Sequence, residues 1–216
     1  MGARNLPDRN RARLGDLISK FIMSAILKTE GYISPEEYLE GERLSEIRHE
    51  YVDGRVYAMA GASDDHNRIA GNLFNELSNR LRGGRCEAFI NDMKVKIPPE
   101  FGDAYYYPDV IVTCDPADDA KYFREKPSYV FEVLSPDTER TDRREKAIAY
   151  RQIPGIKTYV LFEQERIAAT VLRIAEVGWD SKTIEGKEGL LKLPEIGIEI
   201  TLERIYERTA ALKKAG

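Results

Sequence analysis

Short apolar stretches separated by turn residues dominate the middle of the chain and constrain its fold more than any other feature. Three of them, rich in Val and Tyr, cover residues 107–113, 129–134 and 158–162. They are apolar on both faces, which is typical of central strands in a sheet that is covered on both sides. A helix is expected between the last two, from Glu139 to Gln152, and it is a right-handed crossover if those strands are parallel. The pattern predicts an α/β chain with a mixed β-sheet core flanked by helices.

Further elements are expected on either side of this core. Ser34-Pro35-Glu36-Glu37 is a helix start, with a Ser cap, a Pro in the first turn and a Glu three residues after the cap. Asp53-Gly54 is a favoured two-residue turn, so residues 48–59 form an additional N-terminal β-hairpin region. The remaining expectations are a helix from Ser63 or Asp64 to about Arg82, strands at 86–90, 93–97 and 167–174, and a terminal helix at 201–213.

Length and charge bound the organisation of the chain. Its 216 residues lie between one and two domains at about 150 residues per domain. We expect a single domain over residues 23–216, preceded by a basic N-terminal extension over residues 1–22. That extension is either a weakly ordered tail or a helix that docks on the core or on a second subunit. The net charge of −4 excludes a generally basic nucleic-acid-binding protein, so any DNA or RNA contact requires a local basic surface.

Cysteine content and hydropathy exclude other classes. Two cysteines and two histidines cannot build a disulfide scaffold or a zinc finger, and no Cys-x-x-Cys pair is present. The longest nearly apolar run, residues 21–27, is far shorter than the roughly 18 residues that suggest a membrane span. No small-residue cleavage pattern follows it. We therefore expect a cytoplasmic protein with no membrane contact.

Two carboxylates interrupt the apolar runs. Asp109 lies in Tyr-Pro-Asp-Val-Ile-Val, and Glu132 lies in Tyr-Val-Phe-Glu-Val-Leu. Burying a carboxylate is costly unless it is paired, protonated or bound to a metal. Two of them on neighbouring strands would repel each other without a cation between them, and Mg²⁺ or Mn²⁺ suits oxygen ligands. The alternative is that each carboxylate marks a strand end and faces water.

A lysine on the expected crossover helix could complete such a site. Asp142, Lys146 and Tyr150 are spaced four residues apart and share one helix face. That face could point Lys146 at the two carboxylates, where it would hold or activate a water molecule. The alternative is an exposed, ion-paired helix surface. We expect Lys146 to be accessible enough that its loss leaves folding nearly unaffected.

These motifs together resemble a known family. Tyr107-Pro108-Asp109, the segment 131–138 and the Asp142, Lys146 and Tyr150 face are similar to the Uma-type family of the PD-(D/E)XK restriction-endonuclease-like superfamily. Residues 50–54 and His66 also resemble it, and the similarity covers about residues 31–175. The resemblance implies a restriction-endonuclease-like fold and a hydrolase, a Mg²⁺-dependent (or Mn²⁺-dependent) endonuclease that cleaves DNA phosphodiester bonds.

The resemblance also implies roles for individual residues. Asp109, Glu132 and Glu50 would be metal ligands and catalytic residues, and Lys146 would be the catalytic lysine. The superfamily pattern places its lysine two residues after the Glu, where this chain has Leu134. In the Uma-type family the lysine lies on the following helix, which Lys146 matches. The candidate supporting residues are His66, Asp142 and Tyr150.

Expectations about partners follow from charge and from the resemblance. Arg140, Arg143 and Arg144 are candidate phosphate contacts, or else a solvated helix face balanced by neighbouring acids. The resemblance and the need to cut two strands imply a homodimer. A different reading is a catalytically inactive nucleic-acid-binding or interaction module on the same fold, which Leu134 and the acidic net charge favour. A glycoside hydrolase would also use two carboxylates, but its chemistry does not require a nearby lysine.

Overall fold

The computed structural model describes residues 31–136 and 138–215 of the chain. The chain divides into two compact units, Met1–Met59 and Ala60–Gly216, and each is described by itself. The N-terminal extension expected at residues 1–22 lies outside the described residues. The single domain expected over residues 23–216 stays a prediction.

The first unit contains the predicted helix start and the predicted hairpin. Helix α2 (Pro35–Glu42) begins with a capping box, in which Ser34 Oγ accepts from the Glu37 backbone and the Glu37 side chain accepts from the Ser34 backbone. Strands β1 (His49–Val52) and β2 (Arg55–Ala58) are antiparallel. Asp53 and Gly54 both have positive φ, 46° and 83°, as a tight two-residue hairpin turn requires. Both expectations for this region are confirmed.

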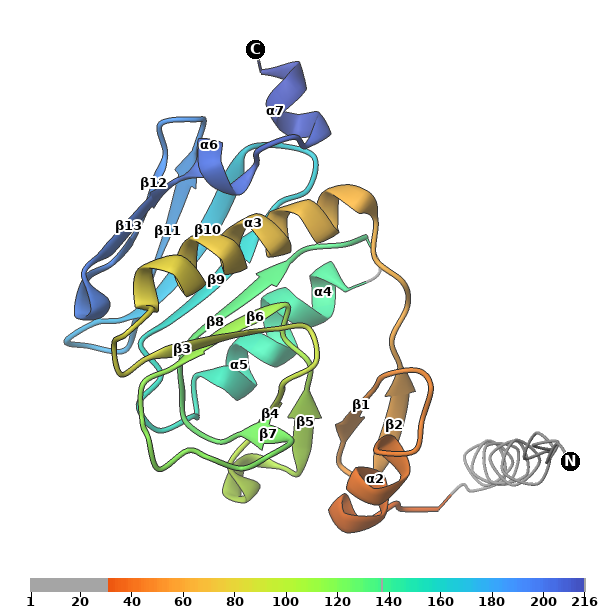
Figure 1. Cartoon of the computed structure of the whole chain (residues 1–216). Coiled ribbons are helices and arrows are strands. Elements are labelled where there is room, and N and C mark those ends of the chain that lie inside the picture. The colour runs from red at the N-terminus through yellow and green to blue at the C-terminus, as the bar shows by residue number, and fades with distance from the viewer. Residues whose placement is uncertain (1–30, 137, 216) are drawn as a thin grey trace, which may run out of the picture. The chain divides into compact units, whose positions relative to one another are not determined.

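The second unit is built around a six-stranded mixed sheet with the order β11-β10-β9-β8-β6-β3 (Figure 1). Strands β8 and β9 are parallel, and every other neighbouring pair is antiparallel. The strands are β3 (Glu87–Ile90), β6 (Val110–Thr113), β8 (Pro127–Val133), β9 (Thr158–Phe162), β10 (Ala168–Ile174) and β11 (Trp179–Glu185).

Smaller elements complete this unit. Strands β5, β4 and β7 neighbour one another in a further sheet, and β12 and β13 form a two-stranded one. These strands are β4 (Lys94–Lys96), β5 (Ala104–Tyr106), β7 (Phe123–Arg124), β12 (Leu190–Leu193) and β13 (Ile198–Thr201). The helices are α3 (Asp64–Leu81), α4 (Glu139–Thr141), a π-helical turn (Asp142–Lys146), α5 (Ala147–Tyr150), α6 (Leu202–Ile205) and α7 (Ala210–Lys214), with short 3₁₀ turns at Pro99–Phe101 and Pro194–Ile196.

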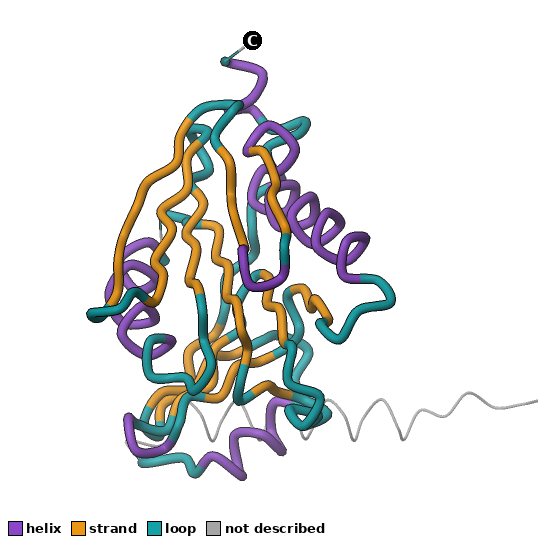
Figure 2. Tube along the Cα trace, turned by 90° about the vertical axis from the view of Figure 1, so that its left-hand side faces the viewer, coloured by secondary structure: helices purple, strands orange, loops and turns teal. Residues whose placement is uncertain are grey.

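Helices cover both faces of the six-stranded sheet. Helix α3 lies on one face, and the crossover segment α4–α5 lies on the other (Figures 1 and 2). Because side chains alternate along a strand, Ile111, Val130 and Glu132 point away from α3. The core under α3 joins Ile69, Leu73 and Leu77 of the helix to Val110, Val112, Tyr129, Phe131 and Val133 of the sheet. The sheet therefore has an apolar face under α3 and a second face that carries Glu132.

Several expected elements differ from the structure. The strand expected within residues 107–113 begins only at Val110, because Tyr107-Pro108-Asp109 forms the link between β5 and β6. The strands expected at 86–90 and 93–97 do not pair with each other: β3 pairs with β6, and β4 pairs with β5 and β7. The terminal helix expected at 201–213 is two short helices, since Arg208 has a positive φ of 64° between them. Strands β11, β12 and β13 were not predicted.

Candidate active site

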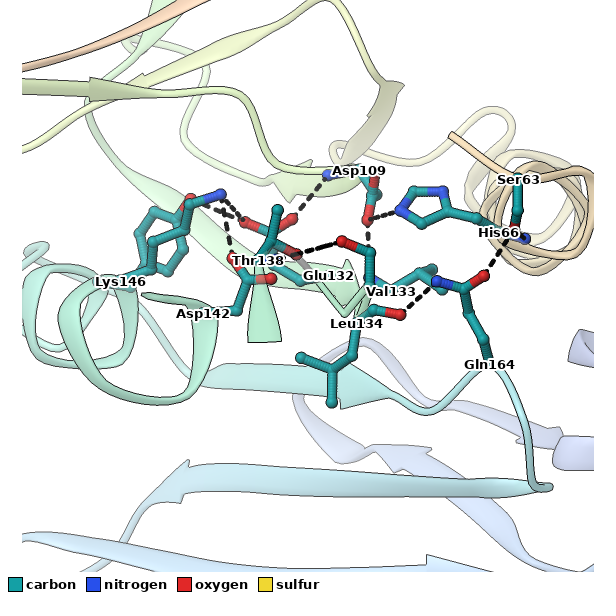
Figure 3. Close-up of polar contacts among 12 residues, drawn as sticks. Ser63, His66, Asp109, Glu132, Val133, Leu134, Thr138, Asp142, Lys146 and Gln164 are labelled. Atoms are coloured by element: carbon teal, nitrogen blue, oxygen red, sulfur yellow. Dashed lines mark hydrogen bonds and ion pairs between the residues drawn. The ribbon is translucent and has the colours of Figure 1, made fainter. Parts of the chain in front are cut away.

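Asp109, which directly precedes β6, lies beside Glu132 of the neighbouring strand β8. Strands β6 and β8 are antiparallel with Val110 opposite Phe131, so the next position brings Asp109 opposite Glu132. The Asp109 backbone N–H donates to Glu132 Oε2 at 3.3 Å, and the Val133 N–H donates to Asp109 Oδ2 at 2.6 Å (Figure 3). The expected adjacency of the two carboxylates is therefore present. Their role as metal ligands stays a prediction.

Burial makes this pair of carboxyl groups unusual. Glu132 is 4 % exposed, and the Asp109 side chain is 16 % exposed. Loss of hydration on burial raises the pKa of Asp109, although His66, the Val133 N–H and Lys146 oppose this shift. Both groups are thus held where an additional cation would stabilise their charged forms.

Lys146 lies between two buried carboxylates. Its Nζ is 3.2 Å from Glu132 Oε1 and 3.2 Å from Asp142 Oδ1. The Tyr150 hydroxyl also donates to Glu132 Oε1, at 3.2 Å. Asp142, Lys146 and Tyr150 thus share one face of the crossover segment, as their spacing predicts. Lys146 is only 4 % exposed, so the expectation of an accessible lysine was wrong.

The crossover segment is not a regular α-helix. Asp142–Lys146 forms a π-helical turn between α4 and α5. Such turns are rare and occur frequently at functional sites. The turn is anchored on the sheet, because the Tyr159 hydroxyl donates to the Asp142 carbonyl at 3.1 Å. It holds Asp142 and Lys146 where both reach the Glu132 face.

His66 approaches Asp109 from the first turn of α3. Its Nε2 lies 3.4 Å from Asp109 Oδ2, and its buried Nδ1 has no hydrogen-bond partner among the described residues. Ser63 caps the helix by accepting from the His66 N–H at 3.1 Å and donates to Gln164 Oε1 at 2.6 Å. Gln164 in turn donates to the Leu134 carbonyl (Figure 3). This bridge ties the start of α3 to the ends of β8 and β9.

The other predicted residues are not all in this cluster. Glu50 lies on β1 of the first unit, opposite Tyr57 in the hairpin, and its role as a ligand stays a prediction. Arg143 is engaged in ion pairs, with Glu139 Oε1 and Glu163 Oε1 each at 2.7 Å. Arg140 and Arg144 are exposed.

One contact of the second unit escaped the sequence analysis, and a second feature concerns a lysine that the sequence offers as an alternative to Lys146. Gln164 follows β9 in a polar turn, and no sequence signal marks it as a bridge to Leu134. Lys94 is 5 % exposed, and its Nζ donates to the Tyr107 hydroxyl at 3.0 Å. The sequence offers Lys94 and Lys96 as alternatives to Lys146 for the catalytic lysine, and Lys94 is the more buried of the two.

The described part of the chain contains neither a ready-made metal-ligand cluster nor a membrane-spanning helix. Within residues 31–136 and 138–215, no group of three or more His, Cys, Asp or Glu side chains is arranged to hold a metal ion. No helix in the same part of the chain has the length and hydropathy needed to cross a membrane.

The mixed sheet and its paired acidic residues are typical of the restriction-endonuclease-like class. In agreement, the chain is similar to a crystal structure from Anabaena variabilis described as "a putative nuclease belonging to DUF820". The match has a TM-score of 0.65 at 17 % identity and covers 81 % of this chain and 97 % of the other. The predicted fold, a restriction-endonuclease-like α/β core with an additional N-terminal hairpin region, is confirmed.

The family follows from sequence. Residues 35–203 match the Uma2 family, described as "Putative restriction endonuclease". An uncharacterized protein of Synechocystis sp. is 36 % identical over 180 residues, which cover 82 % of this chain and 93 % of that protein. A second uncharacterized Synechocystis protein is 31 % identical over 142 residues, or 64 % of this chain and 79 % of its own length. The chain belongs to the Uma2 family, as its motifs predicted, and this membership supports a nuclease function.

Proposed function

We propose that this chain is a Mg²⁺-dependent endonuclease that hydrolyses DNA phosphodiester bonds. The observation that carries the proposal is the position of Asp109 beside Glu132 of β8. Lys146 donates a hydrogen bond to Glu132 at the same place. Membership of a family described as restriction endonucleases supports the reaction class. Mn²⁺ could replace Mg²⁺, because both ions prefer oxygen ligands.

The donor set fits a magnesium ion. Asp109, Glu132 and Asp142 bring three carboxylates to the region around Lys146, and a divalent cation would offset their negative charge. Mg²⁺ is usually bound by one or two carboxylates together with water and substrate phosphate oxygens. A protein cage of three or more ligands is therefore not required. Asp109 and Glu132 would hold the ion, and Glu50 is the further candidate ligand.

The chain itself orients the two carboxylates. The Val133 N–H fixes Asp109 through Oδ2, while Lys146 and Tyr150 fix Glu132 through Oε1. When bound, the cation would neutralise charge on the scissile phosphate and lower the pKa of a water nucleophile. Lys146 would add a compact positive charge beside the attacked phosphate. Asp142 holds the Lys146 ammonium in place through their ion pair.

The proposal also covers how the chain would contact DNA and how many copies of it would act together. Arg140 and Arg144 are exposed near the start of the crossover segment and would contact phosphates on either side of the cleaved bond. A homodimer would place two such sites on one duplex and cut both strands.

Cleavage of supercoiled plasmid DNA tests the proposal. We expect the purified full chain to nick and linearise plasmid with Mg²⁺ or Mn²⁺ and to be inactive with EDTA. Asp109→Asn and Glu132→Gln should each lower the rate by about 100-fold or more, on the scale of a positioned catalytic group. The matched control is Asp119→Asn, because Asp119 is an exposed carboxylate of the same unit. It should cleave like the wild type.

Two further measurements separate the alternatives. An RNA substrate of matched sequence tests the assignment to DNA, and sedimentation tests the homodimer. Binding of a labelled duplex without cleavage under any metal condition would contradict the enzyme and favour the inactive nucleic-acid-binding module. Equal loss of activity in Asp119→Asn would contradict the assignment of the site.

A further inference from the structure

The two cysteines of the chain face each other at one end of the β3–β6 pair. Strands β3 and β6 are antiparallel with Glu87 opposite Thr113, so the next position outward places Cys86 opposite Cys114. The two residues form a disulfide with a Cα–Cα distance of 4.1 Å. Composition alone excluded a disulfide scaffold, and this single cross-strand bond is a different feature that sequence analysis did not predict.

The disulfide lies at one edge of the six-stranded sheet. β3 is an edge strand, and β6 is its neighbour in the sheet order. The pairing covers four residue pairs, from Glu87↔Thr113 to Ile90↔Val110. Just past the other end of this short ladder, the Asn91 N–H donates to the Asp109 carbonyl at 2.9 Å. The same ladder therefore links the cysteine pair to the backbone of Asp109.

The disulfide is also reachable from solvent. Cys86 lines a surface hollow of about 310 Å³ together with the end of α3 and the Gly83-Gly84 turn. Arg82 lines the same hollow, and a nearby guanidinium favours the thiolate form of a cysteine. Cys114 is half-buried rather than enclosed. Cys86 itself is buried, at 7 % exposure, so a small thiol would reach the bond from the hollow and from the Cys114 side.

We propose that Cys86 and Cys114 form a reversible redox site that controls how firmly β3 is held on β6. An external dithiol is the reductant. One of its thiolates attacks a disulfide sulfur to give a mixed disulfide, and its second thiolate resolves that bond. Two electrons pass to the chain, the two cysteine sulfurs each take up a proton, and the dithiol leaves as its own disulfide. This inference does not depend on the proposed nuclease function.

The structural consequence is local. Reduction removes the covalent tie at the Cys86 end. β3 then depends on its four residue pairs with β6, the Asn91–Asp109 hydrogen bond and the packing of Ala88 and Ile90 against the core. Opening of this strand becomes more frequent, and the backbone at Asp109 loses part of its support. β9, in the interior of the sheet, keeps both of its neighbours.

The test uses the full chain in buffers of reduced and oxidised dithiothreitol. Maleimide labelling should find no reactive thiol in the oxidised chain and two after reduction, and reoxidation should restore the first state. Hydrogen exchange should become at least about tenfold faster at residues 87–91 on reduction, since a disulfide typically contributes a few kcal/mol. Exchange at residues 158–162 should not change.

A double variant separates the redox effect from general loss of stability. Cys86→Ala/Cys114→Ala should show the fast exchange of β3 in both buffers, with β9 protected. The proposal is overturned by free thiols under oxidising conditions, by a disulfide that resists dithiothreitol until urea unfolds the chain, or by unchanged β3 exchange after reduction. A variant that fails to fold leaves the wild-type labelling and exchange measurements to decide.

Discussion

Burial raises the pKa of Asp109, so ionising this side chain costs more in the folded chain than in the unfolded one. Between the ordinary value of 3.8 and the raised value, the folded state binds more protons. The contribution of Asp109 to stability is therefore present at low pH and is lost as the pH rises through that window. The buried, ionised Asp109 should therefore make the chain less stable at neutral pH than at low pH.

The variant Asp109→Asn tests whether the stability contribution of Asp109 falls as the pH rises. Asn keeps an oxygen that can accept from the Val133 N–H but cannot ionise, so the variant should be more stable than the wild type at pH 7. The difference should shrink toward zero as the pH falls below 3.8. Urea denaturation between pH 3 and pH 8 measures it. Asp115→Asn should show the opposite sign, because the Ala117 N–H lowers the pKa of Asp115. Parallel curves for wild type and Asp109→Asn would contradict the argument.

Lys146 carries a second residue-level prediction. Lys146→Met removes the ammonium between Glu132 and Asp142, which are 4 % and 1 % exposed. Leaving buried carboxylates without their partner typically costs about 3–5 kcal/mol of unfolding free energy. Adding Asp142→Asn to Lys146→Met should recover part of this loss, because one orphaned charge is removed. Chemical denaturation of the two variants measures both steps. A loss below about 1 kcal/mol in Lys146→Met would show that the ion pair is solvated.

Among the helices, α3 is expected to draw stability from the cap on its first turn. Ser63 caps the helix and also donates to Gln164, so Ser63→Ala removes two hydrogen bonds at once. Loss of an N-cap costs typically about 1 kcal/mol, and we expect at least that decrease in unfolding free energy. Ser78→Ala is the matched control, because Ser78 lies inside the same helix, where Ala is favoured. Equal effects of the two substitutions would show that the cap contributes nothing.

Turn and cap residues predicted those elements whose ends depend on neighbouring residues in the sequence. The Asp53-Gly54 turn and the Ser63 cap place a hairpin and a helix start at the positions observed. Pro108 lacks a donor for the ladder, and the strand expected at 107–113 begins only after it, at Val110. The π turn at 142–146 has no comparable signal, because packing of Asp142 and Lys146 on the Glu132 face selects it.

At the scale of the whole molecule, the sequence did not predict which strands pair when they are far apart in the chain. Strand β3 precedes β4 by a short turn, which favours a hairpin, yet β3 pairs with β6. That pairing brings Cys86 to Cys114, 28 positions away, which composition could not reveal. Asp109 and Glu132 could be recognised individually, because each is a carboxylate within an apolar run. The contact between Ser63 and Gln164 could not be predicted, because it joins two distant segments.

The DNA binding proposed above leads to a prediction about the charges of the whole molecule. The chain carries a net charge of −4, so its affinity for a duplex must come from a few local cations. Arg140 and Arg144 are exposed, whereas Arg143 is bound to Glu139 and Glu163. Each phosphate contact contributes about 0.9 to the slope of log affinity against log salt. Arg140→Ala/Arg144→Ala should therefore lower the magnitude of that slope by about 2, and Arg143→Ala should leave it nearly unchanged. Fluorescence anisotropy of a labelled duplex in EDTA, from about 50 to 200 mM salt, measures the slope without cleavage. If Arg143→Ala has the larger effect, its ion pairs open on binding and the basic surface is centred on that residue.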